Sequence, residues 1–591
     1  MANTVTQTIT ASQGWTAPPG VVEVMVTAVG LSPAFDQSYG NGNGNQNTPG
    51  TSSYGGVLDT TGKLWGWGQN VQGGIGAGTN TTVSSPISVV GGLTWSKFWK
   101  TASFPVSASN DVHTTWGLTT SGALYGWGKN ASGEIGQGTQ SAFSSPVLVA
   151  GGLTWANFFP NTAGYGQFAM TPGGQLYGWG QNTGSGSTSQ YSSPVLVAGG
   201  LTWAKFFPGV QFFAGITQQG ALYQWGTGYA WGNSTSVSVQ SSPVLVLGGI
   251  TNWAQVALDV YAYSHVYGIT YSGALYSWGN NSYGELGDGT TTGRSSPVLV
   301  VGGLSFQAVF PAYDSYGGTS FALGLTTGGQ LYGWGYSQTG LLGNGNAANG
   351  YSSPVLVAGG LTFSKVLFDY VGANVFAVTT GGQLYAWGAN TFGQLGDGTT
   401  STRSSPVLVL GGINWNNLKQ LSYINAAGAA SGVTIQALMN NGSIYAWGSN
   451  NGGLLGNGDG TLASKSSPVL VVGGLSFSQV QSFTPGLNAN GGTYVWCTMG
   501  ITNTGQIYAW GEQTFGDLGA GVQSTGTAVQ SSPVLVVGAL GPNFLPTLNS
   551  IVIPVTPGQT YNVTLGSIYS TFGTQVIGQA PLSQIIVSYE Q

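Results

Sequence analysis

The chain has 591 residues, of which only 4% are charged, against about 25% in an ordinary globular protein. Ten basic and 15 acidic residues give a net charge of −5, which leaves no basic stripe for a phosphate backbone or an anionic membrane surface. We therefore expect no nucleic-acid partner. Hydrophobic residues at 41% and aromatic residues at 12% supply a core, so the 103 glycines do not indicate disorder.

The first 50 residues differ from the rest of the chain. Residues 1–35 alternate apolar and polar residues as paired strands do, and residues 38–50 form a Gly- and Asn-rich linker. The opening MANTVTQTIT lacks the basic region and apolar core of a signal peptide, and Glu23 interrupts the short apolar run after Val21. We expect neither secretion by that route nor membrane insertion, and we interpret residues 1–50 as the N-terminal half of a small β domain with its linker.

One pattern recurs nine times between residues 51 and 545. Each unit contains an apolar strand, a turn ending in Gly, the sequence (L/I)YxWG, a Gly-rich loop, SSPVLV, and GGLTW or a variant. Successive units are about 55 residues apart, a period typical of solenoids and propellers. The tryptophan of the WG step falls at Trp67, Trp127, Trp179, Trp225, Trp278, Trp334, Trp387, Trp447 and Trp510.

The pattern predicts four short antiparallel strands in each unit. Side chains alternate within LYGWG, so Tyr177 and Trp179 lie on one face of a strand. The turn before this strand indicates a hairpin, SSPVLV a third strand with its proline at the start, and the segment after GG a fourth strand. With no sustained helical period, we predict an all-β fold, a β-propeller of about nine four-stranded repeats. We interpret the nine tryptophans as its structural core, packed between units.

The few charged residues fit structural roles. Asp288 precedes Arg294 by six residues, and two later units repeat this spacing with Asp397 and Arg403, and with Asp459 and Lys465. We predict loop-closing ion pairs, worth about 0–1 kcal/mol each if exposed. The acids at repeat positions of the same loops, Glu134, Glu285 and Asp517, favour structural use as well.

No reactive cluster emerges from the remaining residues. His113 and His265 are the only histidines, and we interpret them as surface polar residues because no partners for a triad or a metal site lie near them in sequence. Cys497 is the only cysteine, which excludes an intrachain disulfide and a cysteine-based zinc site. We predict no catalytic residue, no metal ligand, no cofactor and no enzyme activity.

Units three and four depart from the rule because their loops lose the LGxG sequence. Tyr229 and Trp231 stand where neighbouring units have small residues, and Tyr191 ends the loop of unit three. Aromatic side chains on the loops of a rigid scaffold can anchor a partner. These three residues are candidate partner-binding residues; the alternative is that they fill the space left by shortened loops.

Residues 546–591 no longer follow the repeat and again read as strands. Each end of the chain alone is too short to bury a core, so we expect the two ends to pair into one small β domain, with residues 546–591 as its C-terminal half. The inserted repeats at 51–545 must then return their ends to one place. This requirement favours a closed ring over an open solenoid.

These motifs resemble those of two protein families. The line G-x-(L/V)-Y-x-W-G-x-N-x-x-G-x-L-G-x-G resembles the regulator-of-chromosome-condensation repeat family over residues 51–545. That resemblance implies a propeller, of about seven blades in the family, whereas nine units stand here. The ends resemble the halves of the glycine-rich terminal domains of bacteriophage tail-fibre and related virion proteins, through WTAPPGVVEVMVTAVG at 15–30, VTPGQTYNVTLG at 555–566 and STFG at 570–573.

The second resemblance implies our leading hypothesis, a bacteriophage virion structural protein that displays its propeller for host attachment as a tail, neck or surface fibre. Its partners would be other virion proteins, a host-surface glycan or protein, and copies of itself in a homo-oligomer. Its location would be the virion, after synthesis in the host cytoplasm. The alternatives are a capsid decoration protein without a receptor role, an intracellular propeller-type protein-binding module, and a polysaccharide-cleaving tailspike with two facing carboxylates.

Overall fold

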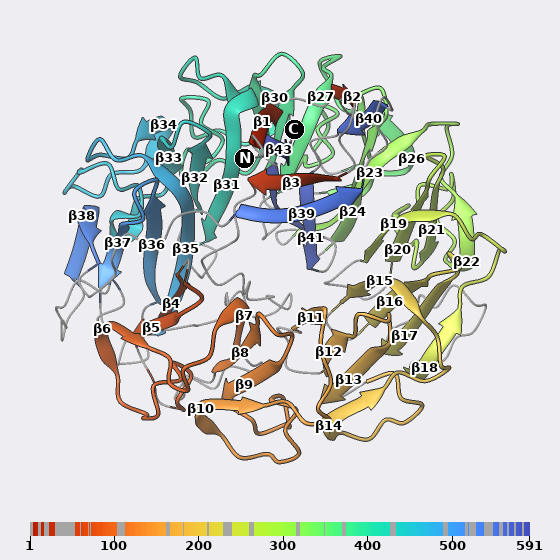
Figure 1. The fold of residues 1–591 in the computed structure, drawn as a ribbon. Coiled ribbons are helices and arrows are strands. Elements are labelled where there is room, and N and C mark those ends of the chain that lie inside the picture. Colours follow the sequence, from red (N-terminus) through yellow and green to blue (C-terminus); the bar gives the residue numbers. More distant parts are fainter. Residues whose placement is uncertain are drawn as a thin grey trace.

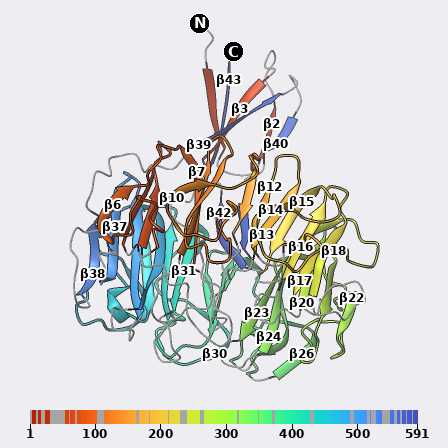
Figure 2. The same cartoon turned by 90° about the horizontal axis from the view of Figure 1, so that it is seen from below.

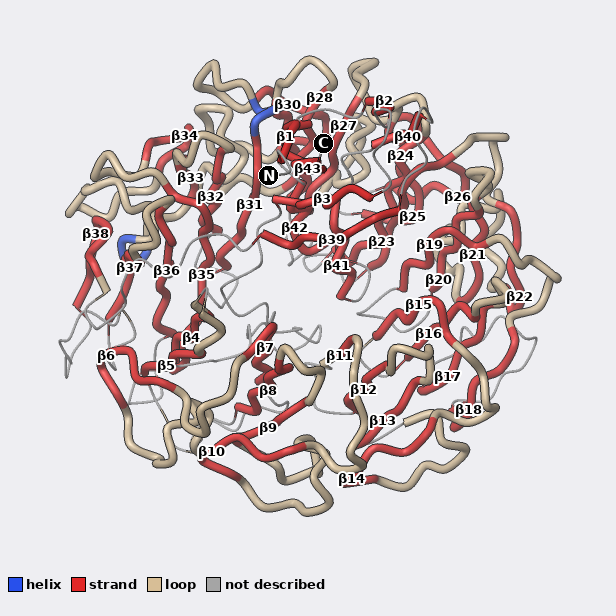
Figure 3. The backbone as a smooth tube through the Cα atoms, viewed as in Figure 1, coloured by secondary structure: helices blue, strands red, loops and turns tan. Residues whose placement is uncertain are grey.

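The structure is a computed structural model in which almost every element is a β-strand (Figure 3). Only two single 3₁₀ turns occur within its described residues, η1 (Trp415–Asn417) and η2 (Asn451–Gly453). It describes residues 4–9, 13–16, 23–29, 54–59, 61–68, 70, 72–102, 113–160, 166–180, 183–209, 212–227, 239–258, 265–314, 319–337, 339–347, 349–368, 374–425, 433–487, 494–513, 518, 528–536, 548–554, 560–563, 567–572, 575–581 and 584–590.

Nine small antiparallel sheets stand around a common centre as the blades of a propeller (Figure 1). The first four are β4 (Tyr54–Leu58), β5 (Leu64–Gly68) and β6 (Val83–Ser88); β7 (Trp95–Ala102), β8 (His113–Thr119), β9 (Leu124–Gly128) and β10 (Phe143–Leu148); β11 (Asn157–Phe159), β12 (Gly166–Met170), β13 (Leu176–Gly180) and β14 (Tyr191–Leu196); and β15 (Trp203–Pro208), β16 (Phe212–Thr217), β17 (Leu222–Thr227) and β18 (Val239–Leu245).

The other five blades follow the same plan. They are β19 (Trp253–Leu258), β20 (His265–Thr270), β21 (Leu275–Gly279) and β22 (Arg294–Leu299); β23 (Phe306–Asp314), β24 (Thr319–Thr326), β25 (Leu331–Ser337) and β26 (Asn349–Leu356); β27 (Phe363–Phe368), β28 (Asn374–Thr379), β29 (Leu384–Gly388) and β30 (Arg403–Leu408); β31 (Leu418–Asn425), β32 (Val433–Met439), β33 (Ile444–Gly448) and β34 (Lys465–Leu470); and β35 (Phe477–Leu487), β36 (Tyr494–Thr502), β37 (Ile507–Gln513) and β38 (Ala528–Leu535).

The predicted fold class, an all-β propeller of nine repeats, is confirmed. Within the described residues, the first blade has three strands and each of the other eight has four. Blades one and nine pack against each other, because Val57 and Trp67 share a buried cluster with Met499 and Ile507. The ring is therefore closed.

Each sequence repeat spans two blades. Our assignment of the strand after GG to its own unit is wrong, because β7 pairs with β8, Lys97 lying opposite Leu118, and not with β6. The strand after GG is the innermost strand of the next blade. Each such connection crosses from the outer edge of one blade to the centre of its neighbour.

The tryptophan of the WG step joins neighbouring blades. All nine of these side chains are fully buried. Trp179 Nε1 donates to the main-chain oxygen of Glu134 in the preceding blade at 2.7 Å, and five other tryptophans make the equivalent bond at 2.8–3.0 Å. In blade five, Trp278 Nε1 donates to the side-chain Oε1 of Gln224 instead, at 3.1 Å. In blade four, Trp225 Nε1 has no hydrogen-bond partner among the described residues.

Glycine makes this close approach feasible. Gly136 has a φ of +80°, and a Cβ there would lie 2.7 Å from Trp179 Nε1. The equivalent glycines of six other loops would bring a Cβ to 2.5–3.0 Å from the next tryptophan's Nε1. Two residues on, the N–H of Gly138 donates to the main-chain oxygen of Ser192 across the same joint at 2.7 Å. The Gly-x-Gly end of the loop is thus shaped by the neighbouring blade.

Strands from the two chain ends pair with each other. One antiparallel sheet has the order β1-β43-β3-β39, and two further pairs join β2 to β40 and β41 to β42. Figure 2 shows β1, β3 and β43 extending beyond one side of the ring. The division into a separate terminal domain stays a prediction. The bounds are β1 (Thr4–Ile9), β2 (Gln13–Thr16), β3 (Glu23–Val29), β39 (Leu548–Pro554), β40 (Thr560–Val563), β41 (Ser567–Phe572), β42 (Gln575–Pro581) and β43 (Gln584–Glu590).

The joint glycines give a first prediction. Gly136→Ala should lower the free energy of unfolding by about 2–4 kcal/mol, because it adds an overpacked methyl to a left-handed backbone. Gly152→Ala is the matched control, since Gly152 also has a positive φ (+62°) but a Cβ there would have no atom within 4 Å. It should cost about 1 kcal/mol. If urea unfolding shows the same loss of stability for both variants, the close contact between Gly136 and Trp179 does not require glycine.

A second prediction separates the indole hydrogen bond from indole packing. Trp179→Phe leaves the Glu134 carbonyl buried without its donor, whereas Trp225→Phe removes an N–H that has no partner among the described residues. Both changes lose similar volume. The Trp179 variant should therefore be less stable than the Trp225 variant by about 1–3 kcal/mol, measured by thermal unfolding of both proteins. A Trp225 variant that is equally destabilised would show that packing alone holds the joint.

Candidate functional site

The ring has two faces and a circumference, which we name from the strand connections. The turn face carries the tight turn between the second and third strands of each blade, such as residues 119–123. The loop face carries the Gly-rich loop between the third and fourth strands. The rim consists of the outermost strands β6, β10, β14, β18, β22, β26, β30, β34 and β38.

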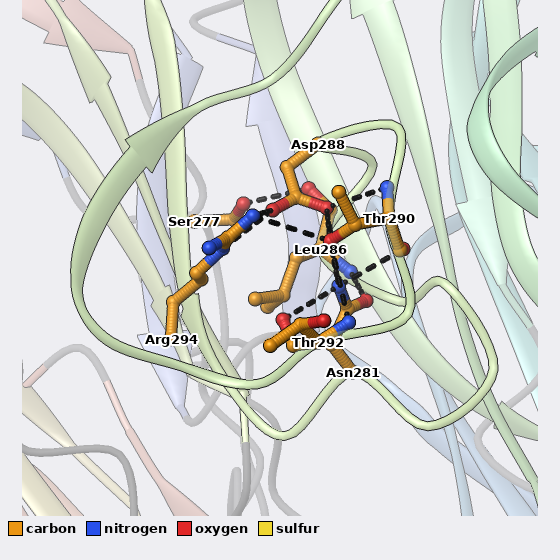
Figure 4. Close-up of polar contacts among 7 residues, drawn as sticks. All are labelled: Ser277, Asn281, Leu286, Asp288, Thr290, Thr292 and Arg294. Atoms are coloured by element: carbon orange, nitrogen blue, oxygen red, sulfur yellow. Dashed lines mark hydrogen bonds and ion pairs between the residues drawn. The ribbon is translucent and has the colours of Figure 1, made fainter.

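An asparagine organises each regular loop on the loop face, as Figure 4 shows for blade five. Asn281 is fully buried, and its Oδ1 accepts from the backbone N–H of Leu286 at 2.9 Å. Its Nδ2 donates to the main-chain oxygens of Thr290 and Thr292 at 3.0 and 3.1 Å. Asn70, Asn130 and Asn390 make the same bonds in their own loops. These side chains are part of the scaffold.

The three acid–base pairs with a spacing of six residues close these loops. Asp288 contacts Arg294 at 2.7 Å, and the two later pairs contact at 3.0 and 2.8 Å. Burial opposes ionisation of Asp288 and Asp397, but hydrogen bonds from threonine and arginine outweigh it and lower the pKa of both carboxyl groups. Hydrogen bonds from Lys465 and Thr461 lower the pKa of Asp459 to about 2. The ion pairs inferred from the spacing are present.

One histidine prediction is wrong. His265 is only 3% exposed, and its Nε2 lies 3.7 Å from Glu285 Oε1, so it is not a surface residue. Burial raises the pKa of Glu285, but the adjacent imidazole of His265 and backbone hydrogen bonds outweigh this effect and lower the pKa. The main-chain oxygen of Glu285 also accepts from Trp334 Nε1. The pair therefore lies beneath a blade joint, which sequence spacing could not reveal.

Glu134 and Cys497 lie within the scaffold of the described blades. Glu134 is buried and accepts from the Ser132 N–H at 2.7 Å. Among the residues that the structure places, no group of three His, Cys, Asp or Glu could hold a metal ion. Cys497 is buried in β36. His113 begins β8, and Asp111 and Asp517 lie outside the described residues.

The candidate partner-binding aromatics are only partly placed. Tyr191 is half-buried at the start of the rim strand β14, opposite Gly180. Tyr229 and Trp231 lie outside the described residues. Their predicted role therefore stays a prediction. In the described part of the chain, no helix is long and apolar enough to cross a membrane.

The rim carries a regular set of exposed leucines that we did not single out from the sequence. In each SSPVLV strand the leucine is 42–53% exposed, and the valine after it is buried. The motif predicts that side chains alternate between the two sides of this strand. Which of them faces water depends on the position of the strand at the outside of the blade. The leucines are Leu148, Leu196, Leu245, Leu299, Leu356, Leu408, Leu470 and Leu535.

The rim becomes more apolar where a second exposed residue follows two positions later. Leu245 with Leu247 and Leu408 with Leu410 are 42–48% exposed, and they flank a buried valine. The first leucine of each pair ends its strand, and the second lies just beyond the strand end. Each pair therefore exposes aliphatic surface next to an edge strand that no further strand covers in the described part of the chain.

Comparison with protein families now names the repeat. Residues 272–311, 381–428 and 441–484 match the model of the regulator of chromosome condensation (RCC1) repeat. The chain contains RCC1 repeats. No match establishes the terminal strands as those of a bacteriophage fibre, and that part of the resemblance stays a prediction.

Curated proteins resemble parts of this chain at moderate identity. The E3 ubiquitin-protein ligase HERC2 of Homo sapiens is 28% identical over 59% of this chain, which is 7% of HERC2. The ultraviolet-B receptor UVR8 of Arabidopsis thaliana is 27% identical over 48% of this chain and 65% of UVR8. The chain thus spans less than two thirds of the length of each of these relatives.

Solved structures that match parts of this chain include human WBSCR16 and Prp20p from Saccharomyces cerevisiae. WBSCR16 is 19% identical with a TM-score of 0.39, covering 61% of this chain and 96% of its own. Prp20p is 18% identical with a TM-score of 0.37, covering 58% of this chain and 85% of its own. Prp20p itself has binding properties towards Gsp1p and histones.

The loop ion pairs predict a defined sensitivity to acid. The folded pKa values of Asp288, Asp397 and Asp459 lie below the ordinary value, so their stabilisation is present above about pH 4 and is lost as the pH falls towards about 2. Changing all three to Asn should lower the unfolding midpoint at about pH 7. The variant and the parent protein should converge near about pH 2. A constant difference across this window would contradict the assignment.

Proposed function

We propose that this protein is a protein-binding scaffold, a ring of RCC1 repeats that presents its rim to a partner. The observation that carries the proposal is the set of half-exposed leucines at one register position of eight successive blades. Single exposed leucines are common on soluble proteins. A repeated set of exposed leucines on unpaired edge strands is uncommon. Such edges promote association, and proteins normally protect them with charged residues.

The chemistry of the rim suits a protein better than a glycan. Aliphatic side chains bind other apolar side chains, whereas sugar rings are usually held by aromatic faces and hydrogen bonds. The carboxylates of Glu134 and Glu285 are held in loop contacts, as described above. The rim is therefore better supported as a site than any acid of the described loops.

The virion-fibre hypothesis stays a prediction. The relatives named above come from an animal and a plant, and no described residue favours host attachment over another protein partner. The shared RCC1 repeats support the alternative of a propeller-type binding module. The ligase activity named for HERC2 is not extended to this chain, because the match covers 7% of that protein.

The proposal is tested by changing the rim two blades at a time. Four variants replace Leu148 and Leu196, Leu245 and Leu299, Leu356 and Leu408, or Leu470 and Leu535 with Asn. Each full-length protein is immobilised, and proteins retained from the cells that make it are quantified by mass spectrometry. At least one variant should retain its partner about tenfold less, because lost apolar burial weakens association.

Tyr283→Asn is the control, since Tyr283 is 50% exposed on the loop face and not on the rim. It should retain every partner. Light scattering of each variant identifies the case in which the partner is a second copy of the chain. If all four rim variants retain the same proteins as the parent, the rim is not the binding surface.

A further inference from the structure

The turn face carries lysines at the start of the innermost strands. Lys97, Lys205 and Lys365 occupy one register position, opposite Leu118, Ile216 and Val378 near the end of the second strand. Lys419 lies one residue earlier in its blade, where η1 precedes β31. Because these strands are the innermost of their blades, the four lysines lie at one level on the inner edge of the ring. The C-terminal strands β42 and β41 lie against two of these strands, β31 and β15.

The ammonium groups bridge successive blades at this level. Lys205 Nζ donates to the main-chain oxygen of Ala254 at 2.8 Å, and Lys365 Nζ donates to that of Leu418 at 3.0 Å. Lys419 Nζ donates to the main-chain oxygen of Ser478 at 2.7 Å. An ammonium has three donors, so each of these groups keeps two for another acceptor.

No carboxylate among the described residues pairs with these four lysines. In the described part of the blades, Asp59 is the one acid on the turn face, and it is 4% exposed. It accepts from the backbone N–H groups of Thr61 and Lys63 and from Trp65 Nε1. The three loop ion pairs all lie on the opposite face. With Lys63 added, the turn face carries five described cations against one buried carboxylate.

Two of these cations, Lys365 and Lys419, are partly buried without a counter-charge among the described residues, whereas Lys63, Lys97 and Lys205 are exposed. Burial lowers the pKa of Lys365, and it lowers the pKa of Lys419 to about 8. With a pKa of about 8, Lys419 remains mainly cationic at neutral pH. An anion placed beside these two lysines would restore the favourable interaction that water no longer supplies.

We infer that the turn face, along the inner edge of the ring, binds an acidic segment of a protein partner. The inference rests on the proposed function as a protein-binding scaffold and adds a second contact, with the charge that the partner must present. A nucleic acid is the less suitable occupant because a few cations set one per blade do not follow a continuous phosphate backbone. Carboxylates spaced along a flexible peptide can reach successive lysines.

The test measures binding of a fluorescein-labelled octaglutamate peptide to the full-length protein by fluorescence anisotropy. The triple variant Lys205→Gln, Lys365→Gln and Lys419→Gln should bind at least about tenfold more weakly, and parental binding should weaken with added salt. Glutamine suits this region, because Gln255, Gln420 and Gln479 occupy the same register position as Lys205 in other blades. Gln420 Nε2 keeps an equivalent bond, to the Val480 oxygen at 2.8 Å.

A control of equal charge change is Arg294→Gln, Arg403→Gln and Lys465→Gln on the loop face. It should bind octaglutamate as the parent does. If both triple variants lose octaglutamate affinity equally, binding responds to net charge alone. If neither variant loses affinity, the lysines do not form a binding site. Tighter, lysine-dependent binding of a labelled single-stranded oligonucleotide would overturn the choice of partner. The rim variants should bind octaglutamate normally, so a failed rim proposal and a failed lysine proposal give different results.

Discussion

The ring depends on the tryptophan of the WG step, whose indole packs against the preceding blade. Each tryptophan of the WG step is fully buried, and in most joints its N–H is bonded to a main-chain oxygen in the Gly-rich loop of the preceding blade. The loop can come so close only because glycine has no Cβ and tolerates a positive φ. Tryptophan and glycine are therefore a matched pair contributed by neighbouring repeats, and neither position can change alone.

Much of this arrangement could be predicted from the sequence, because the repeat displays nine copies of each constraint. The period, the strand alternation around Trp179 and the six-residue spacing of Asp288 and Arg294 all led to features that the structure contains. These are local signals. They depend on residues within one strand or one loop, where spacing along the chain fixes distance in space.

The errors concern relations between segments that are distant in the chain. The strand after GG is equally compatible with pairing to the strand before it or after it, so its place in the next blade could not be read from the repeat. The burial of His265 was not predicted, because its partner Glu285 is distant in the sequence and comes close only when the blade folds. The rim leucines and the turn-face lysines required knowledge of which strand lies outermost and which innermost, a property of the whole sheet.

The closure of the ring has a mechanical consequence. Each blade is built from strands that are consecutive in the chain, so a short backbone connection crosses the joint between one blade and the next. The joint between the first and last blades differs, because it brings together residues from opposite ends of the repeat region, such as Val57 and Met499. The circle would therefore open most readily at this joint, where contacts between distant segments of the polypeptide replace the short connection.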